Sequence, residues 1–257
     1  MMRIVISFCL LLACQQVSAV NVNLQSLPAL LDPFLTGKPA QIKCEEYLKE
    51  VNELNGATLL LASAHCTRAN NLAEAAFLLN SSNIRLAVEL EYFPPSQEEM
   101  GAISFLNMVR TFYTSGVGND KVFRSPLDYA RLKSALLSWQ PMINEQSSPG
   151  WSSVAKQNNF PFAAKIHEVI ASAVLDLDKW AQMLQDDLFY RAKSDYEEFN
   201  AINPQYIAGS AIGDQHDHLK RLFDKQLMRH ICMAAPNTAL QGTHYMPLLG
   251  IPCAPEL

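Results

Sequence analysis

The chain has 257 residues, of which 49% are hydrophobic and 18% are charged, a composition typical of a folded protein rather than a disordered or collagen-like one. Lys and Arg number 20 against 25 Asp and Glu, so the net charge is -5 at pH 7. This balance offers no surplus of basic side chains to neutralise a phosphate backbone, and we do not expect nucleic acid as a partner.

The first part of the chain predicts an export signal over residues 1–19. A basic residue precedes the almost uninterrupted apolar run 4–13, and small residues stand before a cleavage site after Ala19. Residues 11–14 also resemble the lipobox of bacterial lipoproteins, in which Cys14 would carry a lipid anchor. Both interpretations predict an exported protein, periplasmic or secreted. No apolar run is long enough to cross a bilayer, so we expect no transmembrane span.

The cysteines that follow the export signal predict two disulfides. Four remain once that signal is removed, an even count that in an exported protein favours disulfides: Cys44, Cys66, Cys232 and Cys253. Apolar spacing predicts helices over 39–55 and 57–69, which would form an antiparallel hairpin. Cys44 and Cys66 lie about equally far from the turn of this hairpin, so we expect them to pair across it. Cys232 and Cys253 then pair by elimination.

Apolar residues recur at helical spacing along the rest of the chain. We expect five further helices, over about 72–93, 96–114, 125–139, 166–188 and 214–233. Weak helix formers at 80–83 could break the first of these. Ser96 and Glu99 form a capping box, and Ser125 stands before a Pro at the first position of a helix.

These segments predict an all-α fold of stacked antiparallel helical hairpins, either helical-repeat-like or an irregular bundle, stapled by disulfides. Residues 57–80 resemble a tetratricopeptide-type hairpin, but no second copy follows 34 residues later. We therefore expect helical stacking without membership of that family. Residues 20–257 would form a single domain, with 141–160 as the candidate internal boundary.

The richest group of chemically versatile side chains is Asp214, His216 and His218. All three are metal-ligand types, but residues two apart on a helix point ~200° apart and cannot share an ion. We therefore expect a capped helix start there, with no metal and no cofactor. If the protein were a hydrolase of cell-wall glycan or lipid, these residues and His167, as a general base, would carry the reaction. Because no nucleophile motif accompanies them, we assign no catalytic residue.

Aromatic and charged side chains alternate between 187 and 206, a mixture that interaction surfaces often show. We expect four of these residues to contact a protein partner: Phe189, Tyr190, Tyr196 and Phe199. The favoured function is an exported, non-catalytic protein that binds another protein, such as an adaptor, an inhibitor or an immunity-type factor. The alternatives are the secreted or periplasmic hydrolase, and an envelope lipoprotein anchored through Cys14.

Overall fold

The computed structural model describes residues 23, 26, 44–115, 119–144, 146–151, 161–203 and 206–234. Across these ranges the fold is all-α, as the sequence predicts, and no strand occurs in them. The helices are α2 (Cys44–Lys49), α3 (Gly56–Arg68), α4 (Leu72–Tyr92), the 3-10 helix η2 (Gln97–Glu99), α5 (Met100–Ser115), α6 (Asn119–Arg124), α7 (Pro126–Ser138), α8 (Phe162–Gln185), α9 (Asp187–Ile202) and α10 (Ala211–Ala234).

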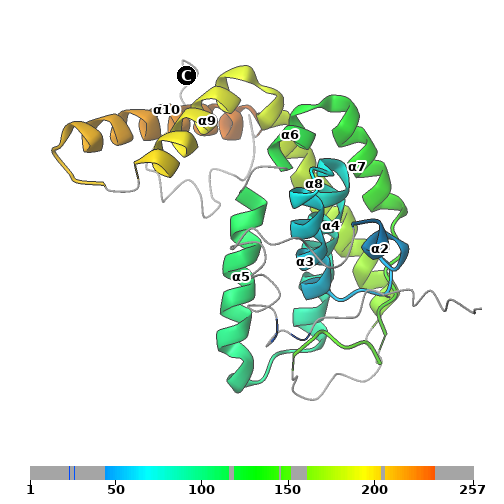
Figure 1. Ribbon diagram of the computed structural model, residues 1–257. Coiled ribbons are helices and arrows are strands. Elements are labelled where there is room, and N and C mark those ends of the chain that lie inside the picture. The colour runs from blue at the N-terminus through cyan, green and yellow to red at the C-terminus, as the bar shows by residue number, and fades with distance from the viewer. Residues whose placement is uncertain are drawn as a thin grey trace, which may run out of the picture.

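The helices form a bundle with a projecting pair at one end. Helices α3, α4, α6, α7 and α8 make up the bundle, α5 runs along one side of it, and α9 and α10 extend together away from its top (Figure 1). One cluster of buried apolar side chains runs through the bundle from α2 to the start of α9. A smaller cluster fills the space between α3, α4 and α5.

A disulfide ties α2 to α3. The sulfur atoms of Cys44 and Cys66 are 1.99 Å apart and their Cα atoms 5.0 Å apart, and this is the pair that the hairpin spacing predicts. Cys232, on α10, is also disulfide-bonded. Its expected partner, Cys253, lies outside the described residues.

Near the first hairpin, one helix is shorter than predicted and the next matches its predicted extent. Helix α2 ends at Lys49, earlier than predicted, because the following turns direct the Asn52 carbonyl toward the Met142 N–H, 2.6 Å away. Helix α4 is unbroken at 80–83. Two of the polar side chains there are hydrogen-bonded: Asn80 donates to the Ala76 carbonyl one turn earlier in α4 at 2.7 Å, and Ser82 donates to the Gly56 carbonyl of α3 at 2.7 Å.

At the other helix starts, some of the predicted capping residues form hydrogen bonds and others do not. Ser125 accepts a hydrogen bond from the Asp128 N–H at 3.3 Å, as predicted, whereas the side chain of Ser96 makes no capping bond and a 3-10 turn precedes α5 instead. The long helix predicted to reach Leu188 ends at Gln185. Asp186 interrupts it, because its carboxylate accepts from backbone N–H groups of the next turn and so begins α9.

A buried ion pair joins α4 to the start of α3. Arg85 and Glu89 are 1% and 0% exposed, and Arg85 Nε donates to Glu89 Oε1 at 2.7 Å. The other carboxylate oxygen accepts from the Gly56 N–H at 3.0 Å, at the positive end of α3. Arg85 Nη1 donates to the Met142 carbonyl at 2.9 Å. Each charge is therefore paired and hydrogen-bonded, which a buried charge requires.

The same contact explains the glycine at the start of α3. A Cβ at Gly56 would lie 2.4 Å from Leu86 Cγ and 3.0 Å from Glu89 Oε2. Only glycine lets α4 approach closely enough for the Glu89 carboxylate to reach the helix start. The asparagine beside it completes the cap, because Asn55 Oδ1 accepts from the Thr58 N–H at 2.9 Å.

The irregular segment 139–151 is fastened to this hairpin at several points. Besides the Met142 bonds, Asn55 Nδ2 donates to the Ser148 carbonyl at 3.3 Å and Trp151 Nε1 donates to the Phe93 carbonyl at 2.9 Å. The segment therefore lies against the same helices that the ion pair joins. In the described part of the chain, no helix combines the length and apolar character needed to cross a membrane.

We expect the ion pair to behave as a coupled unit. At pH 8, Arg85→Met or Glu89→Leu alone should lower the free energy of unfolding by ~3–5 kcal/mol, because each leaves one buried charge uncompensated. The double variant should lose clearly less than the two single losses added together. Urea denaturation of the four proteins measures this coupling, and additive losses would contradict it.

The ion pair should also make the free energy of unfolding depend on pH through Glu89. Burial raises the pKa of Glu89 to about 7, while the Arg85 cation and the Gly56 N–H oppose that rise. Because the folded state then holds the proton more tightly than the unfolded chain, this contribution to stability is complete below about pH 4.5 and is lost as the pH rises to about 7. Between those values the free energy of unfolding should fall relative to that of Glu89→Gln. A constant difference would show that Glu89 stays ionised throughout.

Candidate functional site

Helices α9 and α10 pack antiparallel to form a hairpin that extends beyond the bundle, here called the arm, residues 187–234 (Figure 1). Asp186 organises the base of the arm. One carboxylate oxygen accepts from the Leu188 N–H at 2.8 Å, and the other lies 2.9 Å from His230 Nε2 and 3.4 Å from Arg229. Partial burial would raise the pKa of Asp186, but these donors outweigh it and hold the pKa below its ordinary value.

A second set of charges joins the arm to α6. Lys193 is buried between the carboxylates of Asp120 and Glu197, the latter at 2.8 Å. Burial alone would lower the pKa of Lys193, but the two carboxylates outweigh it and raise the pKa. Beside this group, Arg124 donates to Asp187 at 2.8 Å. The base of the arm is thus held to the bundle at two points. One is the set of charged contacts with α6, and the other is Asp186.

The aromatic residues expected to contact a partner lie instead on the inner side of the arm. Phe189 is 0% exposed and packs between Trp180 and Phe223, with ring centroids 5.8 and 5.7 Å away. Tyr196 stacks on Phe223 at 5.8 Å, and Phe199 is buried. These three residues therefore hold the two arm helices to each other and to α8.

Tyr190, the fourth expected contact, lies at the junction with the bundle. The guanidinium of Arg124 sits 3.9 Å from the centre of its ring, a cation–π contact between α6 and α9. These aromatic side chains of α9 are therefore turned toward the protein. Phe189 and Phe199 are both buried: side chains of α8 and α10 contact Phe189, and His216 of α10 contacts Phe199.

We expect the buried Phe189 to contribute more to the stability of the fold than an exposed side chain of the arm does. Phe189→Ala should lower the free energy of unfolding by ~3–5 kcal/mol, because it removes a fully buried ring. A matched change at an exposed position of the same arm, Ile207→Ser, should alter it by no more than ~0.5 kcal/mol. Urea denaturation distinguishes the two. Equal effects would mean that Phe189 does not hold the arm together.

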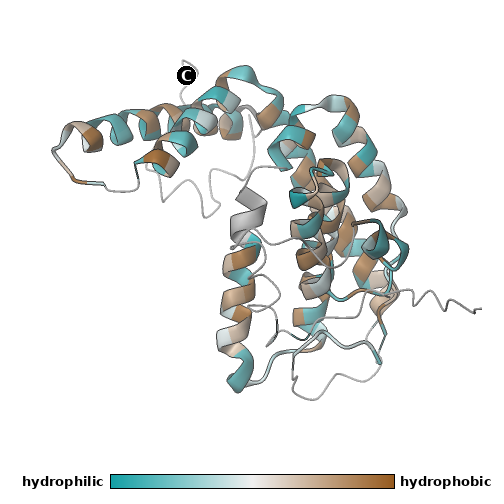
Figure 2. Ribbon diagram, in the orientation of Figure 1, coloured by the Kyte–Doolittle hydropathy of each residue, from teal (hydrophilic) through white to brown (hydrophobic). Residues whose placement is uncertain are grey.

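The far end of the arm exposes a group of apolar side chains, whereas elsewhere on the arm Leu188 and Leu222 are exposed singly. Four large apolar side chains at the far end are 41–67% exposed: Ile202, Tyr206, Ile207 and Ile212. We call these four residues the tip. Figure 2 shows the apolar ends of α9 and α10 on either side of the connection, against a mostly hydrophilic arm. A signal for the tip does exist in the sequence, because residues 199–213 contain no charged side chain.

The residues considered for metal binding or hydrolysis form the beginning of α10. The helix starts at Ala211, earlier than predicted, and Ser210 caps it by accepting from the Gly213 N–H at 3.1 Å. His216 faces Tyr196, 3.4 Å from its hydroxyl, and Asp217, 3.1 Å away, whereas His218 is exposed. Hydrogen bonding from His216 lowers the pKa of Asp217. Among the described residues no three His, Cys, Asp or Glu side chains are grouped as a metal site requires.

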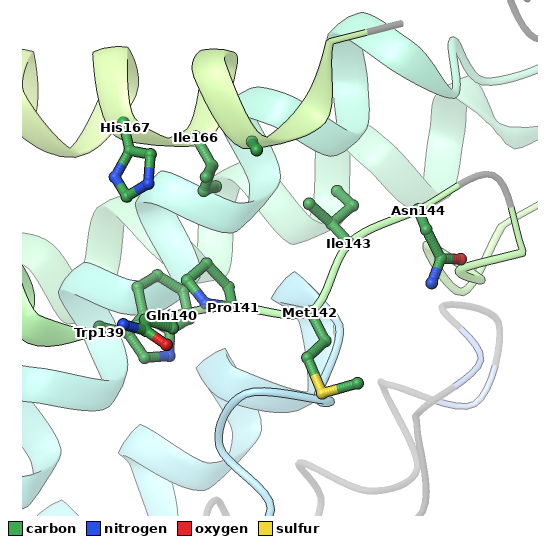
Figure 3. Close-up of a pocket in the computed structure, with 9 residues that line it drawn as sticks. Trp139, Gln140, Pro141, Met142, Ile143, Asn144, Ile166 and His167 are labelled. Carbon is green, nitrogen blue, oxygen red and sulfur yellow. The ribbon is translucent and has the colours of Figure 1, made fainter. Parts of the chain in front are cut away.

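His167, the expected general base, lies elsewhere, at the edge of a pocket of about 390 Å³ in the bundle (Figure 3). The lining comes from segment 139–144 and the beginning of α8: Trp139, Gln140, Pro141, Met142, Ile143, Asn144, Ala163, Ile166 and His167. Among the described residues of this lining, none supplies a carboxylate, hydroxyl or thiol beside the imidazole. The structure also separates His167 from Asp214, His216 and His218, which begin α10 at the far end of the arm (Figure 1).

Comparison of the chain with protein-family models, with curated proteins and with solved structures finds no significant match.

Proposed function

We propose that this chain is an exported, non-catalytic protein that acts by binding another protein in a fixed stoichiometry, and that the arm is its binding element. The observation that carries the proposal is the arm itself. Its base is held to the bundle by buried charges, its interior is filled by its own aromatic side chains, and its far end exposes apolar side chains to solvent. Exposed apolar groups on a rigid projection are typical of interaction sites.

The remaining parts of the proposal concern the compartment and the scaffold. We propose that residues 1–19 are removed on export and that the rest forms one domain of stacked helical hairpins. The Cys44–Cys66 disulfide supports an oxidising compartment, periplasmic or extracellular, because such bonds are rare in reducing ones. The pocket beside His167 offers a hydrolase little support, because the lining residues that the structure describes place no nucleophile or carboxylate next to the imidazole.

Site-specific photo-cross-linking in the producing cells tests the proposal. A benzophenone side chain placed at Ile207 or Leu222 on the arm should give one discrete adduct of constant stoichiometry with another protein. The matched position on the bundle is Leu175, which is 63% exposed on α8 and should give little or no adduct. The proposal fails if no position yields a protein adduct. It also fails if the purified chain hydrolyses cell-wall glycan or phospholipid with turnover that His167→Ala abolishes.

A further inference from the structure

Charge is distributed unevenly along the arm. We call residues 194–219 its outer half. They contain five acidic residues and no Lys or Arg: Asp195, Glu197, Glu198, Asp214 and Asp217. The part of α10 nearer the bundle is basic instead, with four cationic residues and one acidic residue between 220 and 234. The arm therefore presents a strongly negative far end.

Part of this negative charge faces solvent. Glu197 pairs with Lys193, and Asp217 contacts His216. Asp195, Glu198 and Asp214 have exposed side chains, and the side chain of Glu197 is still 46% exposed beside Lys193. They flank the uncharged stretch 199–213 on both sides along the chain, so the apolar tip is bordered by carboxylates on α9 and on α10.

We infer that the outer half of the arm docks into an apolar pocket rimmed by Lys and Arg side chains on a partner protein. The inference rests on the proposed function and adds the partner's chemistry. Ile202, Ile207 and Ile212 act as the anchors, because burying each of them removes exposed apolar area from water. The carboxylates beside them select a basic rim, since complementary charge sets specificity and the rate of association.

Two other binding partners of the tip, an anionic bilayer and a second copy of the chain, fit its negative surroundings less well. The surface of an anionic bilayer would repel the carboxylates that border the tip. A second copy could offer its basic part of α10, but among the side chains described there, over 220–232, only Leu222 is a large exposed apolar residue, which gives three isoleucines no pocket to enter. Both occupants are outcomes of the experiment described next.

A displayed library of random dodecapeptides, selected on the immobilised full chain, provides the probe. Enriched peptides should combine apolar residues with Lys or Arg. Fluorescence polarisation then measures the Kd of an enriched peptide for the chain and its variants. Ile202→Ser with Ile207→Ser should weaken binding at least ~10-fold, and Glu198→Lys with Asp214→Lys should weaken it by a similar factor. Raising the salt from about 50 mM to about 500 mM should weaken it further.

Matched controls come from the exposed surface of α8. Leu175→Ser and Glu168→Lys with Asp176→Lys make the same chemical changes away from the arm and should leave the Kd unchanged. Thermal melting of each variant checks that the fold is kept. The inference is overturned if enriched peptides lack basic residues, or if the arm variants bind as well as the controls.

The remaining outcomes separate the inference from the proposed function. Tip-dependent binding to vesicles of phosphatidylcholine and phosphatidylglycerol would overturn the inference and assign the tip to a bilayer. A dimer in sedimentation that Ile207→Ser dissociates would overturn it in favour of a second copy. If no peptide is enriched while photo-cross-linking from Leu222 still traps a protein, the docking inference fails and the proposed function stands.

Discussion

The arrangement of the bundle depends on one buried charge pair and the glycine that admits it. Arg85 and Glu89 are stable inside the protein only because each has further partners: the carboxylate meets the start of α3 at Gly56, and the guanidinium meets the Met142 carbonyl. The pair therefore sets the relative position of three pieces of chain that are distant in sequence. Apolar packing alone would tolerate more variation there, whereas a buried charge penalises any arrangement that leaves it unpaired.

Charged contacts also fix the junction between the arm and the bundle. Lys193 and Asp186 each combine a buried or half-buried charge with partners on other helices, and Phe189 adds apolar contact with Trp180 of α8. These contacts fix the base of the arm to the bundle. A rigid projection loses little conformational freedom when its far end is bound, which favours affinity.

Local sequence patterns predicted most of the helices and the Cys44–Cys66 disulfide, because both follow from helical spacing within a short stretch of chain. The same patterns did not separate α8 from α9. The apolar stripe continues past Asp186, and whether this residue belongs to a helix or caps the next one depends on the backbone N–H groups it meets. The aromatic residues of α9 posed a similar problem, since aromatic side chains dominate cores and interfaces alike.

The sequence by itself determined the all-α fold, the approximate position of most helices and the first disulfide, because each depends on the 3.6-residue period and on neighbours close in the chain. Only the tertiary structure decided which face of each helix is covered. Phe189 is buried because Phe223 and His230 return to it from α10, a contact that no local pattern encodes. The tip is exposed for the complementary reason: the part of the chain that the structure describes brings no other helix over it.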